Sequence, residues 1–206
     1  MPLGVLKAGL LEFKPALPPA KLDAIAALDM GNLEKVVFRF ERAFWREARR
    51  RSFVYLSDTY GEFPFFFDYT AFGGTPALVG LYCGNFARAQ AARSDAELRE
   101  RVLAIFTEIF GAGIGAPTHF ARTRWTTDPL AGGSYSYVPV GGSLSDMDVL
   151  GEPTGERLLF AGEATVPAYY GTVHAAFISG VREAKRLLQA DTVQLSSGPA
   201  PEVGCA

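Results

Sequence analysis

The residues best suited to chemistry lie near the end of the chain, where an apolar run ends in a glycine and a carboxylate. Residues 158–161 are apolar, Gly162 and Glu163 follow, and an amphipathic helical pattern begins near Thr172. This order predicts a strand, a loop and a helix. A carboxylate beside the unpaired N–H groups of a helix N-terminus suits a ribose hydroxyl and an electron-rich ring. An isolated Gly-Glu pair, by contrast, more often only satisfies loop amides.

Two other side chains have a structural and a chemical interpretation. Lys21 stands in the first turn of a helix predicted to begin at Pro18-Pro19. A partly desolvated lysine near a helix N-terminus loses its proton more easily, but in isolation such a lysine is usually a surface residue. Trp125 ends a predicted strand that begins at Thr118, and a lone tryptophan there is usually part of the core.

The remaining pattern predicts an antiparallel sheet with an aromatic face and two long helices. Strands are expected at 35–40, 53–56, 65–69 and 77–83, separated by Gly, Pro and Asp. The capping box Ser94-Asp-Ala-Glu97 opens a helix that ends at Gly111. The last helix, about 172–189, carries apolar residues on one face and charged residues on the other. Residues 126–155 read as a long loop, which in a compact domain is usually functional.

Composition excludes several classes of protein. The 206 residues are 49% hydrophobic and 20% charged with a formal net charge of −2, so nothing favours binding to nucleic acid or an anionic membrane. Cys83 and Cys205 form no disulfide framework and suit a reducing compartment. His119 and His174 have no accompanying cluster, so we expect no metal site. No apolar run reaches the ~20 residues of a bilayer span. We expect a protein that is not secreted, in the cytoplasm, nucleus or peroxisome.

Several motifs together carry a resemblance to a known family. They are Leu158-Leu-Phe-Ala-Gly-Glu-Ala-Thr165 with Tyr169-Tyr-Gly-Thr-Val-His174, the run from Pro2 through Lys21 and Gly31-Asn-Leu-Glu-Lys-Val-Val37 to Phe44-Trp45, and Arg122-Thr-Arg-Trp-Thr-Thr-Asp-Pro-Leu-Ala-Gly-Gly-Ser-Tyr-Ser-Tyr137. In this order they resemble the C-terminal part of the FAD-dependent amine oxidases, which include polyamine oxidases and flavin-dependent histone demethylases. The resemblance extends from Pro2 to about Leu188.

The resemblance implies a fold that is α/β plus α+β, the C-terminal portion of a two-domain enzyme. A mixed-sheet substrate domain would be joined to the last strand and helix of a Rossmann-like FAD domain. The implied boundaries are 1–18 for the end of an FAD-domain strand and a linker, 19–125 for the substrate-binding domain, 126–190 for the C-terminal part of the FAD domain, and 191–206 for a disordered tail. No G-x-G-x-x-G motif occurs in these residues, so we expect a partial chain.

The resemblance also implies roles for individual residues. Lys21 matches the lysine that holds a water near flavin N5. FAD would be bound by Trp125, Gly162, Glu163, Thr172 and Val173, and the substrate by Tyr135, Tyr170 and Thr172. The chain departs from the family pattern at Leu130, where a tryptophan is frequent, at Ala164, where a histidine is frequent, and at Ala175, where glycine is usual.

The implied reaction converts an amine to an imine while O2 is reduced to hydrogen peroxide. The expected partners are a small amine, O2 and the missing N-terminal half. A polyamine or other small amine is favoured over a histone, because the long helical insertion and the preceding domain of histone demethylases are lacking. One alternative is a non-catalytic remnant or binding module unable to hold FAD alone. Another is a desaturase of the same superfamily, against which the sequence around Lys21 argues.

Overall fold

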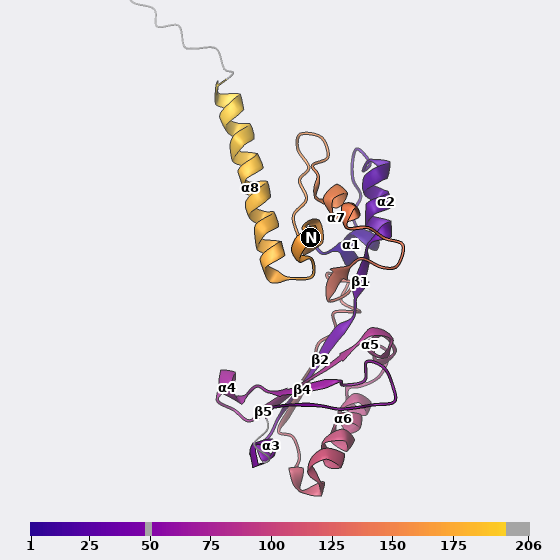
Figure 1. Ribbon diagram of the computed structural model, residues 1–206, viewed down its shortest axis with the longest axis vertical. Coiled ribbons are helices and arrows are strands. Elements are labelled where there is room, and N and C mark those ends of the chain that lie inside the picture. Colours follow the sequence, from indigo (N-terminus) through magenta and orange to yellow (C-terminus); the bar gives the residue numbers. More distant parts are fainter. Residues whose placement is uncertain (48–50, 197–206) are drawn as a thin grey trace, which may run out of the picture. The chain divides into compact units, whose positions relative to one another are not determined.

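The computed structural model describes residues 1–47 and 51–196, which form two compact units. One unit comprises Met1–Asp29 together with the residues from Ser136 onward, and the other comprises Met30–Tyr135 (Figure 1). The chain passes between the units within β1 (Asp29–Gly31) and β7 (Tyr135–Tyr137). Residues 191–196, which were expected to belong to a disordered tail, continue the last helix, α8 (Val173–Ser196). Residues 197–206, including Cys205, lie outside the described residues.

The unit of residues 30–135 is built on a five-stranded sheet with the order β3-β4-β5-β2-β6. Its strands are β2 (Leu33–Arg39), β3 (Ser52–Val54), β4 (Phe65–Asp68), β5 (Ala77–Cys83) and β6 (His119–Arg122). All recorded pairings are antiparallel, and β2 pairs with β5 from Leu33↔Cys83 to Arg39↔Ala77. The predicted antiparallel sheet is therefore confirmed, with strand ends within a few residues of those expected.

One face of this sheet is covered by the helix α6 (Asp95–Phe110), which forms the predicted capping box between Ser94 and Glu97. Alternate residues of β2, such as Val36 and Phe38, are fully buried on this face, as strand geometry requires. The core is strongly aromatic, and Phe106 of α6 lies 5.4 Å from Phe38 and 5.1 Å from Phe66 between ring centroids. The short elements are α3 (Phe44–Glu47), α4 (Thr70–Gly73), α5 (Gly84–Gln90) and η1 (Ala112–Ile114).

The other unit consists of helices and turns. Its elements are α1 (Leu3–Lys7), α2 (Pro19–Ala27), α7 (Leu144–Gly151), η2 (Glu163–Thr165), η3 (Pro167–Tyr169) and α8 (Val173–Ser196). The predicted start of the last helix near Thr172 is confirmed. The helix α7 lies inside the predicted loop 126–155. Its capping box of Ser143 and Asp146 was the available sequence signal.

Two expectations for this unit are wrong. Residues 3–7 form a helix instead of the end of a strand, and 158–161 form no strand but make a single bridge, Thr154↔Leu158. A strand requires a neighbour for its N–H and C=O groups, and the described residues place no strand beside 158–161. Within this unit, α2 packs against α7.

The packing of α8 reverses the usual order of an amphipathic helix. Its buried side chains are the small or polar Ala175, Ser179 and Glu183. The face that the sequence marks as apolar is exposed, with Val173 88% and Phe177 72% exposed. The charged side of the helix is thus the side that holds the unit together.

Candidate functional site

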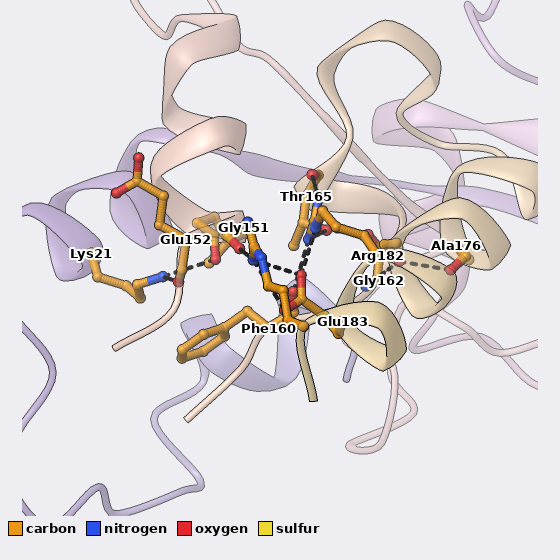
Figure 2. Close-up of polar contacts among 12 residues, drawn as sticks. Lys21, Gly151, Glu152, Phe160, Gly162, Thr165, Ala176, Arg182 and Glu183 are labelled. Atoms are coloured by element: carbon orange, nitrogen blue, oxygen red, sulfur yellow. Dashed lines mark hydrogen bonds and ion pairs between the residues drawn. The ribbon is translucent and has the colours of Figure 1, made fainter. Parts of the chain in front are cut away.

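Lys21 is a buried residue of α2 that caps another helix. Only 3% of the residue is exposed. Its Nζ donates to the carbonyl oxygen of Leu150 at 3.0 Å and to that of Glu152, both at the C-terminal end of α7. The ammonium also lies 4.1 Å from the centre of the Phe160 ring. Figure 2 shows Lys21 reaching toward Glu152 and Phe160.

The sequence allowed two interpretations of Lys21, a surface residue or a group with a chemical role, and these contacts exclude only the first. The surface-lysine interpretation is wrong, because the residue is buried. Burial lowers the pKa of Lys21 below 10.5, and the negative charges of Glu152 and Glu183 partly oppose this shift. A lowered pKa agrees with the expected chemistry. The contacts themselves are those of a cation at a helix C-terminus, where the carbonyl groups carry partial negative charge.

Glu163 organises the loop that leads into α8. Its carboxylate accepts hydrogen bonds from the backbone N and the hydroxyl of Ser136, at 3.0 and 2.5 Å, and from the backbone N of Gly171 at 2.6 Å. Glu163 therefore does satisfy loop amides. A carboxylate has about four acceptor positions, so one position on Oε1 is left for a further donor such as a hydroxyl group.

The backbone around Glu163 is fixed by α8. Gly162 has φ 146° and ψ 163°, a conformation that is essentially restricted to glycine. Its N–H donates to the hydroxyl of Ser179 at 2.8 Å. Arg182 donates to the carbonyl oxygens of Thr165 at 2.8 Å and Phe160 at 2.9 Å, as Figure 2 shows. The loop is thus held on both sides of Glu163.

Arg182 is itself held by an ion pair. Glu183 is 6% exposed and accepts from Arg182 at 2.5 Å and from Arg186 at 2.9 Å. The sequence placed these residues only on the charged face of a helix, since nothing local indicates that the carbonyl groups of Phe160 and Thr165 are their partners.

The N-terminus of α8 has unpaired donors. The hydroxyl of Thr172 accepts from the backbone N of Ala175 at 3.2 Å, as an N-cap residue does. Within the described residues, the amides of Val173 and His174 donate to no protein acceptor. Gly162, the free position on Glu163 and these amides fit a ligand with hydroxyl groups and an electron-rich ring, which is the chemistry expected of FAD. Tyr170, which precedes this turn, is 38% exposed. Ala175, which stands where glycine is usual in the family, is fully buried.

The other unit carries the two remaining predicted site residues. Trp125 is 44% exposed, so its ring is not part of the core. Tyr135 is 38% exposed and lies against Gly31, where an added Cβ would come within 2.9 Å of the tyrosine ring. A glycine at position 31 is thus required for the observed position of Tyr135.

Lys35 is another lysine within the stretch that carries the family resemblance. It lies on β2, and its neighbours Glu34 and Val36 point to the face that α6 covers. Lys35 therefore belongs to the opposite face, together with Val37 and the paired residue Leu81. Sequence reasoning selected Lys21 alone, although alternation along β2 would have placed Lys35 on this face.

Two negative findings apply to the described residues. No group of three or more His, Cys, Asp or Glu side chains there could hold a metal ion. No described helix is long and apolar enough to cross a membrane.

Comparison with known proteins supports the family resemblance. The model of a family described as flavin containing amine oxidoreductase matches residues 1–188. Lysine-specific histone demethylase 1 homolog 1 of Oryza sativa subsp. japonica is 41% identical over 196 residues, which are 92% of this chain and 23% of that protein. Protein FLOWERING LOCUS D of Arabidopsis thaliana is 40% identical over 92% of this chain and 25% of its own length. The chain spans about a quarter of these curated relatives.

Solved structures show the same fold. Cyclohexylamine oxidase from Brevibacterium oxydans IH-35A matches with a TM-score of 0.73 and 26% identity over 91% of this chain and 42% of that one. Putrescine oxidase matches with a TM-score of 0.78 and 20% identity, covering 41% of its chain. These matches confirm the mixed fold, α/β plus α+β, of part of a two-domain flavoenzyme. The chain belongs to the flavin containing amine oxidoreductase family.

Proposed function

We propose that this chain provides part of the active site for the FAD-dependent oxidation of an amine to an imine. O2 takes up the two electrons and two protons lost by the amine and becomes hydrogen peroxide. The observation that carries the proposal is the family match across residues 1–188. FAD, when bound, supplies the redox chemistry, and the protein supplies position and electrostatics.

Within this proposal, the loop at Glu163 and the N-terminus of α8 bind the cofactor. The carboxylate of Glu163 would accept from a cofactor hydroxyl. The amides at Val173 would face the part of the flavin ring that becomes negative on reduction, since a helix N-terminus stabilises negative charge. Gly162 contributes a backbone conformation that other residues rarely adopt.

The substrate side of the proposal rests on aromatic residues. Tyr135 and Tyr170 would line the amine site and Trp125 would lie near the flavin. Ring faces suit an amine, because a cation is attracted to the electron density of the ring. Thr172 would contribute its hydroxyl next to the helix N-terminus.

Two lysines are candidates for the group that handles protons near the flavin. Lys21 is our first assignment, supported by its lowered pKa. Its contacts with Leu150 and Glu152 support the competing view that it only positions α7. Lys35 is the alternative, since it lies on the face of the sheet opposite α6.

The substrate is proposed as a polyamine or another small amine. A second candidate is a methylated lysine of a histone, favoured by the name of the 41% identical rice relative, lysine-specific histone demethylase 1 homolog 1. The alternative from another class, a non-catalytic binding module, predicts that no amine is oxidised in any context.

A chimera tests these proposals. Residues 1–188 would replace the matching segment of the rice relative, to which the chain is 41% identical. We expect hydrogen peroxide release with at least one of putrescine, spermine, cyclohexylamine or a methylated histone peptide, and the responding amine identifies the substrate class. A folded, flavin-loaded chimera that is inactive with all of them favours the binding module.

Variants of the chimera separate the two lysines. Lys21→Met should slow flavin reduction by roughly 10²-fold, as expected for loss of a general acid–base group, with less effect on flavin content. If instead Lys21→Met reduces at the parental rate and Lys35→Met is slow, the assignment passes to Lys35.

A further inference from the structure

Glu34 is a buried carboxylate whose role the family assignment leaves unexplained. It lies on β2 and is 3% exposed, on the face of the sheet that also buries Val36. Within the described residues its hydrogen-bond donors are hydroxyl and backbone N–H groups, with no cation among them. Burial of a charge is costly unless hydrogen bonds compensate for it, so Glu34 depends on these donors and holds them in place.

The partners of Glu34 all lie in one turn that is distant in sequence. Oε2 accepts from the hydroxyl of Thr123. Oε1 accepts from both the backbone N and the hydroxyl of Thr126, each at 2.8 Å. These residues are 89 and 92 positions away along the chain. They lie on either side of Trp125, so a single carboxylate binds the Thr123 side chain before the tryptophan and the backbone N and side chain of Thr126 after it.

Further contacts connect the turn to the sheet and close it. The hydroxyl of Thr123 also accepts from the backbone N of Lys35 at 2.8 Å, and the backbone N of Thr123 donates to the carbonyl of Lys35 at 3.0 Å. On the far side, the backbone N of Gly133 donates to the carbonyl of Trp125 at 2.9 Å. The backbone at Trp125 is therefore fixed, while 44% of the residue is exposed.

We propose that Glu34 is a positioning residue that fixes the turn 123–126 and thereby the direction of the Trp125 side chain. A hydrogen bond to a charged acceptor contributes more than a neutral one, and three such bonds converge on this carboxylate. Removing it would leave the Thr126 amide without its acceptor. The proposal depends on the proposed function only for the use that is made of the positioned ring.

Nuclear magnetic resonance of the 15N-labelled chain tests this proposal without flavin. The sequence has two tryptophans, Trp45 and Trp125, so Trp125→Phe assigns their two indole N–H signals. In Glu34→Ala we expect the Trp125 signal to shift or broaden, while the signal of Trp45, which is fully buried, keeps its position. Glu62→Ala is the matched control, since Glu62 is 7% exposed and bonds Arg101 and Ser57. It should leave Trp125 unchanged.

Two milder variants keep the test decisive if Glu34→Ala does not fold. Glu34→Gln keeps one carbonyl acceptor for Thr126 and should retain the Trp125 signal closer to its original position. Thr126→Val removes only the hydroxyl contact and should move the Trp125 signal alone. Folded variants whose Trp125 signal matches that of the wild type would overturn the proposal. Because flavin is absent, this result is distinct from a failure of the chimera to oxidise amines.

Discussion

At the scale of single residues, the site is built from side chains that bind backbone groups distant in sequence. Glu163 binds amides of Ser136 and Gly171, Arg182 binds the carbonyl of Phe160, and Lys21 binds the carbonyl of Leu150. The sequence identified Glu163 because a glycine, a carboxylate and a helix start are adjacent. It could not identify Arg182 or Glu34, since their partners lie in other elements and leave no local pattern.

Lys21 should make the stability of the chain depend on pH. Its pKa in the folded state is lowered below 10.5, so the folded state binds fewer protons than the unfolded one. The contribution of Lys21 to stability is therefore smallest below the folded pKa and increases as the pH rises toward the unfolded value. We expect Lys21→Met to lower the free energy of unfolding by about 1–3 kcal/mol, because two carbonyl groups lose their hydrogen-bond donor.

Thermal unfolding at a series of pH values from neutral up to the ordinary lysine value of 10.5 measures this effect. The difference in Tm between wild type and Lys21→Met should increase with pH. Lys7→Met is the matched control for lost hydrogen bonds, because Lys7 also donates to helix carbonyls but is exposed. If the difference in Tm between wild type and Lys21→Met decreased with pH, burial would not be what lowers the pKa of Lys21.

Glu163 should affect cofactor content more than Lys21 does. In the chimera, Glu163→Ala removes both the loop anchor and the proposed cofactor contact, so we expect flavin to be lost before any change in the rate per bound flavin. Glu163→Gln keeps an acceptor oxygen and should retain more flavin. Flavin content is measured from absorbance after gel filtration. Equal flavin content in the parental chimera, Glu163→Ala and Glu163→Gln would contradict the assignment of Glu163 to the cofactor site.

At the scale of elements, the sequence predicted what local patterns determine. The sheet of residues 33–83 and the helix α6 were found because alternating Val and Phe residues and a capping box are local signals. The strand expected at 158–161 was wrong because a strand depends on a partner, and α7 was missed in a segment rich in glycine and serine. The buried polar face of α8 follows from its ion pairs, which the helical period alone does not reveal.

The capping box of α7 should contribute as much to the free energy of unfolding as that of α6. Ser143→Ala removes the cap of α7 and should destabilise its unit by about 1 kcal/mol, with Ser94→Ala as the matched change in α6. Because both residues stabilise one short helix and helix formation is cooperative, Ser143→Ala and Lys21→Met should not be additive. Urea unfolding of the two single variants and the double variant checks this. Strict additivity would mean that the two ends of α7 act independently.

At the scale of the whole molecule, the exposed apolar face of α8 should govern behaviour in solution. Val173 and Phe177 are 88% and 72% exposed, and large exposed apolar patches promote association or dye binding. We expect Phe177→Lys to lower the binding of a hydrophobic dye and to raise the solubility of the 206-residue chain without lowering its Tm. A Tm several degrees lower would show that Phe177 packs within the unit.

The 206-residue chain alone should hold FAD weakly, because it contains no G-x-G-x-x-G turn for the pyrophosphate. We expect the 206-residue chain to be colourless after purification, and the chimera to be yellow because it retains flavin. A stoichiometric flavin complex of the 206 residues alone would contradict this expectation and would require another pyrophosphate site.

Anaerobic reduction of the chimera by an amine tests most directly whether these residues form part of an amine-oxidising site. Absorbance near 450 nm reports oxidised flavin, and in the absence of O2 the electrons of the amine remain on the cofactor. We expect the chimera to carry flavin and to lose this absorbance when the responding amine is added, and we expect the absorbance to return with air. A folded chimera whose flavin keeps its absorbance with every amine, yet is reduced by dithionite, would contradict the claim that these residues form part of an amine-oxidising site.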